Sequence, residues 1–289
     1  MKRLLKFVFV SISLFPLCSC NNKTTYKDSD FDGLYDNIDP SPKDNTYKAK
    51  FIKADIDEGN YTNEMSFSVD YRKIIDHQFE FDPDVALVGA MLCFDSEGPY
   101  EKSIITKNPI YEKNSTYNLC QQFGISEIET YTVTGDIDQY DSCYICMGNH
   151  KFIYNNVKYQ IFVPIIYGYS KLSDWAGNFD LGANTPSCQE VTGEHPDWID
   201  KKNHKGFDVT ANRAYKYIEN YMVKYTDNDF TSFVFGCGQS RGASILNLIA
   251  RKFSDEYKDV LSSFYCFNPA LTTTNVTSED EYPNILNCS

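Results

Sequence analysis

Apolar and polar positions in the second half of the chain follow the periods of strands and helices in turn. The run from Tyr159 to Gly168 is almost continuously apolar, which predicts a buried strand that ends at a glycine. Residues 208–225 keep apolar side chains three and four apart, which predicts a helix with Asp208 as its cap. Shorter apolar runs predict further strands at 232–237, at 263–268 before Pro269, and from 284 onward.

The first half carries weaker periodicity. Residues 67–93 favour a helical segment interrupted around Pro83. Short strands are expected at Thr130–Val133 and Lys151–Tyr154. Strands that alternate with helices indicate an α/β fold whose mostly parallel sheet is covered by helices.

The junction between the strand at 232–237 and the next helix carries the most specific chemistry. Gly238 and Gly242 lie two residues on either side of Ser240, which gives the pattern G-x-S-x-G. A nucleophile elbow needs small residues at both places, because larger side chains would collide with the neighbouring strand and helix. The following residues bury one helical face, formed by Ala243, Leu246, Ile249, Ala250 and Phe253.

Chain length and net charge limit the classes of function and partner that are expected. The chain has 289 residues, of which 42% are hydrophobic, enough for one large domain with tails. Its formal net charge is −13, and no stripe of basic residues breaks that charge. Nucleic acid is therefore excluded as an expected partner, as is charge-driven adhesion to an anionic membrane.

The first twenty residues are typical of an export signal. Lys2 and Arg3 precede a short apolar stretch, Leu4–Leu17, and the segment ends at Cys20. Leu17 at −3 and Ser19 at −1 resemble a bacterial lipobox, which predicts that Cys20 is lipidated and that the protein is anchored on the extracytoplasmic face of the cell membrane. An ordinary secretory signal is the alternative.

Residues 21–60 are polar and predict a tether rather than a domain. Within the tether, residues 28–39 place carboxylates at positions 1, 3, 5, 9 and 12 of a calcium loop with Gly33 at position 6; the expected Ca²⁺ ligands are Asp28, Asp30, Asp32, Asp36 and Asp39. Prolines follow where an exit helix would begin, so the segment resembles the short calcium repeats of surface proteins more than a paired EF-hand. A solvated acidic linker is the alternative.

Cysteines follow no small-scaffold disulfide framework. Cys143 and Cys146 form a C-x-x-C pair, with His150 four residues further on. Zinc would need a fourth ligand, and the sequence has no second pair, so structural thiols are favoured over a metal site.

From Tyr61 to the C-terminus the motifs resemble, in order, those of the class 3 (fungal-type) lipase family. The matching segments are Tyr167-Gly-Tyr-Ser170, Asp174-Trp-Ala-Gly-Asn-Phe179, His204-Lys-Gly-Phe207, Gly238-Gln-Ser-Arg-Gly242 and Tyr265-Cys-Phe-Asn-Pro269. The resemblance implies an α/β-hydrolase domain over residues 61–289 that hydrolyses carboxylic esters, usually of lipids.

Site roles follow from the same resemblance. Ser240 is the implied nucleophile, and the backbone N–H groups of Tyr169 and Arg241 are the implied oxyanion donors. Tyr169 stands where the family often has Ser or Thr. His204 is interpreted as a packing residue in preference to a base.

The sequence departs from the family after the nucleophile. This fold uses the order Ser, Asp, His, yet no histidine follows Ser240, and all four histidines (His77, His150, His195 and His204) precede it. We therefore expect a C-terminally incomplete domain with weak or no hydrolysis. Three interpretations stay open: a fragment, a non-catalytic surface protein that binds an ester or acyl ligand, and a hydrolase whose base comes from upstream. Outside the hydrolases, the alternative function is a binding or adhesion lipoprotein on a calcium-stiffened stalk.

Overall fold

A computed structural model describes residues 27, 29, 43, 47–54, 62–94, 116–134, 142–167, 203–270, 272 and 281–288. The N-terminal elements are β1 (Tyr47–Ala54), β2 (Thr62–Val69), α1 (Tyr71–Asp76), α2 (Pro83–Phe94) and α5 (Thr116–Gln122). The remaining elements are β3 (Ser126–Thr134), β4 (Ser142–Tyr154), β5 (Val157–Tyr167), α8 (Lys205–Tyr225), β6 (Thr231–Gln239), α9 (Arg241–Glu256), β7 (Leu261–Phe267) and β8 (Ile285–Cys288).

A six-stranded mixed sheet organises the molecule in the order β3-β4-β5-β6-β7-β8. The strands from β5 to β8 run parallel, whereas β3, β4 and β5 pair antiparallel. Helix α8 connects β5 to β6 and α9 connects β6 to β7, so the predicted alternation of strands and helices is confirmed. The sheet and its helices fit an α/β-hydrolase-like fold.

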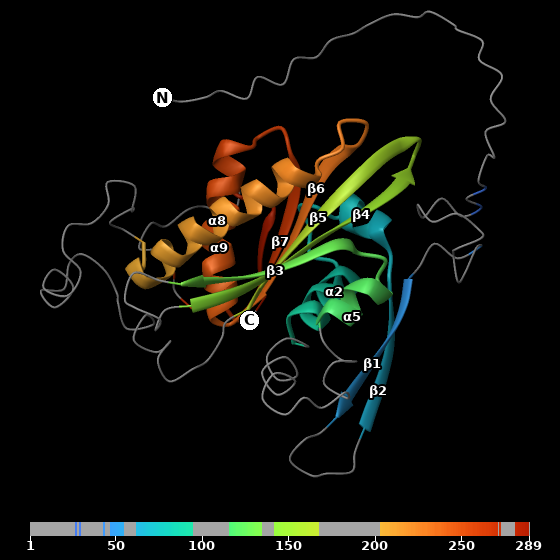
Figure 1. The fold of residues 1–289 in the computed structure, drawn as a ribbon, viewed down its shortest axis with the longest axis horizontal. Coiled ribbons are helices and arrows are strands. Elements are labelled where there is room, and N and C mark those ends of the chain that lie inside the picture. The colour runs from blue at the N-terminus through green and yellow to red at the C-terminus, as the bar shows by residue number, and fades with distance from the viewer. Residues whose placement is uncertain are drawn as a thin grey trace, which may run out of the picture.

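Helices cover both faces of the sheet (Figure 1). Alternate residues of β6 face opposite layers: Phe233, Phe235 and Cys237 pack in the cluster that contains α1, α2 and α5. Val234 packs instead with α8 and α9 in a second cluster. Both core clusters pack against β6. The strand that leads into Ser240 is therefore held in place from both faces of the sheet.

The structure changes two local expectations and confirms a third. Helix α8 begins at Lys205 with His204 at its N-cap, and no side chain caps it there, so the cap predicted at Asp208 is wrong. Residues 67–69 end strand β2 and are not helical. The interruption predicted around Pro83 is confirmed, because helix α1 ends at Asp76 and Pro83 begins helix α2, where proline is well tolerated.

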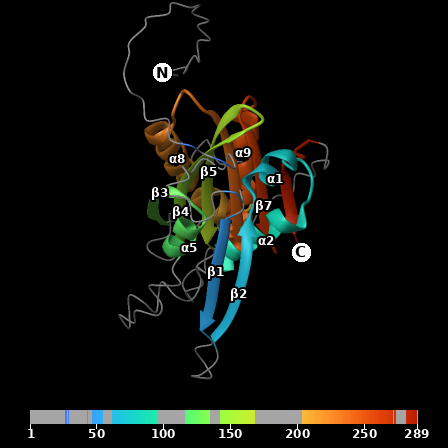
Figure 2. The ribbon, with the colours of Figure 1, turned by 90° about the vertical axis from the view of Figure 1, so that its right-hand side faces the viewer.

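The segment predicted as a tether contains strand β1, which pairs antiparallel with β2 in a separate two-stranded sheet. Figure 2 shows this ribbon extending away from the six-stranded sheet. Within the described residues, no helix combines the length and apolar character needed to cross a membrane.

Candidate active site

Ser240 lies at the sharp turn between β6 and α9, with φ 54° and ψ −125°. These angles match the first central residue of a type II′ turn, a conformation that glycine normally occupies. A residue with a Cβ held there is strained by about 1–3 kcal/mol. The elbow predicted from G-x-S-x-G is therefore present in the backbone, and the Ser240 side chain is exposed at its tip.

Two features hold the strained turn. The Ser240 N–H donates to the Phe267 carbonyl of β7 at 2.8 Å, which extends the sheet ladder to Ser240. On the other side, a Cβ at Gly238 would lie 2.8 Å from the Gly242 oxygen and 3.1 Å from the Ala243 nitrogen. Only glycine at 238 lets α9 begin this close to β6, as the motif predicts.

Ser244, one turn into α9, ties the elbow to the chain that leaves β7. Its Oγ accepts a hydrogen bond from the Ala270 N–H at 2.8 Å and lies 3.4 Å from the Ser240 carbonyl oxygen. The Ser244 side chain is fully buried. Sequence reasoning did not single out this residue; its only signal was a small polar side chain four positions after Ser240 on the buried side of the helix.

Arg241 begins helix α9 directly after Ser240. Its backbone N–H lies in the first turn, where helical N–H groups have no acceptor within the helix and are available to an anion. The guanidinium is buried, and its carbon lies 5.7 Å from the centre of the Phe207 ring. Burial lowers the pKa of Arg241 to about 10, so the side chain stays charged at neutral pH.

His204 is held by packing. Its ring stacks on Phe207 with centroids 4.0 Å apart, and its backbone N–H donates to the Thr272 carbonyl at 2.7 Å. Because Phe207 also contacts Arg241, one aromatic ring links the beginnings of α8 and α9. These contacts support the packing role predicted for His204.

The other two described histidines lie away from the elbow. His150 on β4 is level with Phe233 on β6, seven residues before Ser240 and thus about 23 Å along the strand. Its Nδ1 contacts the Gly124 oxygen. His77 lies within 4 Å of Glu80 and Asp82. Among the residues that the structure describes, the Ser240 side chain makes no capping bond, and no histidine forms a hydrogen bond with its hydroxyl.

Several predicted residues lie outside the described ones: the oxyanion residue Tyr169, the lipidation residue Cys20, and the calcium ligands Asp28, Asp30, Asp32, Asp36 and Asp39. The second oxyanion donor therefore stays a prediction. Strand β5, which precedes Tyr169 in the chain, ends at Tyr167 opposite Gln239, so β5 and β6 end at the same edge of the sheet.

Cys143 and Cys146 point to opposite faces of β4, since one packs in the α8–α9 cluster and the other in the α2 cluster. Two thiols on opposite faces of a strand do not converge on one ion. Over the residues that the structure describes, no group of three or more His, Cys, Asp or Glu side chains is arranged for a metal ion.

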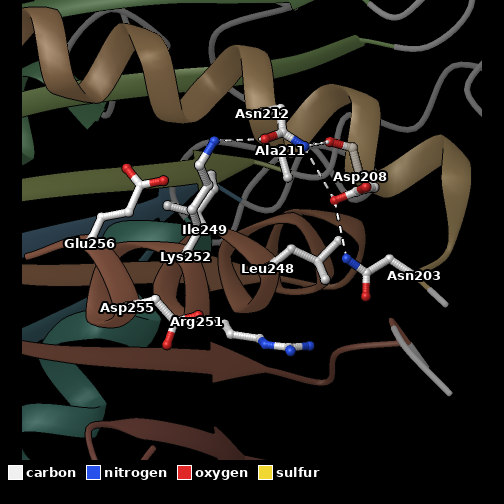
Figure 3. A pocket seen from close by; sticks show the side chains of 10 residues that line it. All are labelled: Asn203, Asp208, Ala211, Asn212, Leu248, Ile249, Arg251, Lys252, Asp255 and Glu256. Atoms are coloured by element: carbon white, nitrogen blue, oxygen red, sulfur yellow. Dashed lines mark hydrogen bonds between the residues drawn. The ribbon is translucent and has the colours of Figure 1, made fainter. Parts of the chain in front are cut away.

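A separate pocket of about 380 Å³ lies between α8 and α9 (Figure 3). The Asn212 amide bridges its two helices: Nδ2 donates to the Asp208 carbonyl, and Oδ1 accepts from Lys252 Nζ, both at 2.8 Å. The nearest lining residue of α9 is Leu248, eight residues and about 12 Å along the helix from Ser240. Measured along α9, the pocket therefore lies away from Ser240.

No protein-family model and no curated protein matches the sequence. Solved structures of fungal lipases align with the chain at low similarity. A triacylglycerol lipase from Penicillium expansum has 16% identity and a TM-score of 0.30 over 50% of this chain and 51% of its own. MDLA from Penicillium cyclopium, in a mutant form, has 14% identity and a TM-score of 0.36 over 76% and 71%.

The Rhizomucor miehei lipase propeptide complex has 13% identity and a TM-score of 0.33 over 71% of this chain and 55% of that chain. The chain spans about half the length of the Penicillium expansum lipase. Identities and scores this low do not show a shared activity, so chemistry has to be argued from the elbow itself.

Proposed function

We propose that this chain is a lipase-like serine hydrolase of carboxylic esters, with Ser240 as its nucleophile. The strained backbone of Ser240, exposed between β6 and α9, carries the proposal. Strained residues of this kind cluster at functional sites, and a sharp turn from strand to helix is the place where such strain presents a nucleophile to substrate. The five family-like motifs favour an ester over an amide substrate.

The proposed reaction is acyl transfer. Ser240 Oγ attacks the ester carbonyl while its proton passes to a base, and the carbonyl oxygen takes up negative charge. The Arg241 N–H and the positive end of α9 face the edge where that charge forms, and Tyr169 is the proposed second donor. The Ser240 N–H bonds to Phe267 and is not available for this purpose.

The rate is expected to be low. No histidine follows Ser240 in the sequence, and the described contacts of His204 hold it against Phe207. Removing one member of a triad lowers turnover by about 10⁴-fold or more and leaves the contribution of binding and the oxyanion hole. We therefore propose a reactive serine with weak turnover of lipid-type esters.

A fluorophosphonate probe and p-nitrophenyl esters of short and long acyl chains test the proposal. We expect the full chain to be labelled by the probe, and Ser240→Ala to lose both labelling and any ester hydrolysis. Ser232→Ala, at the opposite end of β6, is the matched control and should keep both. If wild-type and Ser240→Ala label equally, Ser240 is not the nucleophile.

The alternative is a surface protein that binds an ester or acyl ligand without turnover. It is favoured by the contacts described for His204, whose ring stacks on Phe207, and by Ser240, whose side chain makes no capping bond. Under this alternative, the wild-type chain would bind fatty-acid esters in a fluorescence displacement assay and remain unlabelled by the probe. Labelling that depends on Ser240 rules it out.

Surface attachment and calcium binding are separate proposals that rest on the sequence. Cys20 is proposed to carry the acyl anchor, and Asp28, Asp30, Asp32, Asp36 and Asp39 to bind Ca²⁺ with a stiffening rather than catalytic role. Palmitate labelling that disappears in Cys20→Ala tests the anchor. Calorimetric titration with CaCl₂, compared between wild type and Asp32→Asn, tests the loop, and equal heats would overturn that proposal.

A further inference from the structure

Two buried thiols face each other beneath the elbow. Helix α2 packs on β6, and a Cβ at Gly89 would lie 3.5 Å from the Cys237 Cβ. Cys93 lies one turn after Gly89 and so presents its side chain to the same strand. Cys93 and Cys237 are hydrogen-bonded to each other and are both 0% exposed.

Two further thiols near Cys237 are less suited to bond with it. Cys146 is level with Cys237 but two strands away, with β5 between them, which separates their Cα atoms by about 9.6 Å. A disulfide spans at most about 7 Å between Cα atoms. Cys266 lies on the adjacent strand β7 but packs on the opposite face of the sheet.

We propose that Cys93 and Cys237 form a disulfide that joins α2 to β6, three residues before Ser240, when the chain folds under oxidising conditions. The thiolate of one cysteine attacks a sulfur of a small-molecule disulfide such as oxidised glutathione and releases one thiol. The second thiolate then displaces the other half. One S–S bond forms and one breaks, two protons leave the cysteines, and two electrons reduce the oxidant.

The burial of both sulfurs determines the stage of folding at which the disulfide can form. In the folded chain both sulfurs are shielded from solvent, and burial raises the pKa of Cys237, so little thiolate is available. The bond therefore has to form before α2 closes on the sheet. Once formed, it links residues far apart in sequence and restricts the unfolded chain, which stabilises the fold that holds the elbow.

The experiment is oxidative refolding of the full chain in a glutathione redox buffer, followed by acid quenching, alkylation of remaining thiols under denaturing conditions, and peptide mass spectrometry. We expect a disulfide-linked peptide pair containing Cys93 and Cys237. Complete alkylation of both residues, or linkage of either to another cysteine, would overturn the proposal. The peptide map of the wild type needs no variant to fold.

Melting curves give a second, independent readout. The oxidised wild type should melt about 5–15 °C above the reduced protein. Cys93→Ala should abolish this difference. Cys146→Ala removes a thiol of the same size from the same core cluster and should retain it. If Cys146→Ala loses the difference and Cys93→Ala keeps it, the proposed pairing is wrong.

Discussion

At the scale of single residues, Ser240 combines a strained backbone conformation with an exposed side chain. Its φ of 54° persists because the residues around it leave no relaxed alternative: β6 holds it from one side, the Phe267 carbonyl fixes its N–H, and α9 begins at once. Strain that surrounding structure imposes can be measured by relieving it. Such a measurement tests the elbow without any assay of activity.

Replacing Ser240 by glycine should therefore stabilise the fold. We expect Ser240→Gly to raise the free energy of unfolding by about 1 kcal/mol in urea, because glycine adopts these angles without a Cβ penalty. Ser232→Gly, within the extended part of β6, should lower it by a similar amount. Equal losses from both substitutions would show that Ser240 is not strained.

Ser244 offers a test of how the elbow is tied to the segment after β7. Ser244→Ala leaves the part-buried Ala270 N–H without its acceptor and should cost about 1 kcal/mol of stability in urea unfolding. Ser244→Cys keeps a weak acceptor of similar size and should recover part of the loss. Probe labelling of Ser240 should slow in Ser244→Ala, and an unchanged labelling rate would remove the proposed link to the elbow.

At the scale of elements, strong periodicity predicted most of the C-terminal half. The expected strands at 159–168, 232–237 and 263–268 and the helix at 208–225 all occur, with their ends shifted by a few residues. Local sequence patterns gave the wrong element or the wrong boundary where contacts between distant residues determine the structure. Asp208 has the chemistry of a cap, but α8 begins earlier, at Lys205, next to the His204 bond to Thr272. Strand β2 follows from its pairing with β1, which no local pattern records.

The contact between β6 and α9 predicts the outcome of a single added methyl group. Gly238→Ala would place a Cβ 2.8 Å from the Gly242 carbonyl oxygen, a backbone atom that cannot move without shifting α9. We expect a loss of about 1–3 kcal/mol in unfolding free energy and slower probe labelling. Gly89→Ala would bring a Cβ within 3.3 Å of the Phe267 ring, a side chain that can shift where backbone cannot, and it is the milder control. A Gly238→Ala protein as stable as Gly89→Ala would contradict the packing.

At the scale of the whole molecule, two cores share one sheet. Strands such as β6 contribute alternate side chains to the α2 cluster and to the α8–α9 cluster. The sequence predicted both layers in outline, since apolar runs on central parallel strands require cover on both faces. It placed Ser240 at an elbow from the G-x-S-x-G spacing and the strand and helix on either side, and the role of Ser240 as nucleophile, which the family resemblance implies, stays a prediction. The neighbours of Ser240 that are far away in sequence, Phe267 and Ala270 through Ser244, depend on strand order and could not be read from any motif.

Tyr265 shows how the α2 layer responds to pH. The ring is buried on β7, and its hydroxyl accepts from the Asp82 N–H at 3.3 Å beside the start of α2. Burial raises the pKa of Tyr265 to about 12, above its ordinary value of 10.0. The folded state therefore disfavours the phenolate, so the stability contributed by Tyr265 is complete below pH 10 and is lost as the pH rises towards 12.

Urea unfolding measured between pH 9 and pH 12 tests whether stability falls with rising pH, as predicted. The free energy of unfolding should fall over the upper part of that range, and Tyr265→Phe should make the fall shallower because a group that titrates differently in the two states is gone. Tyr131→Phe, whose ring is 48% exposed, is the control and should leave the slope as it is in the wild type. Burial also raises the pKa of Tyr217 and of Tyr257, so part of the decline should remain in Tyr265→Phe. A slope that Tyr131→Phe changes as much as Tyr265→Phe would mean that the hydroxyl at the start of α2 is not shielded from water.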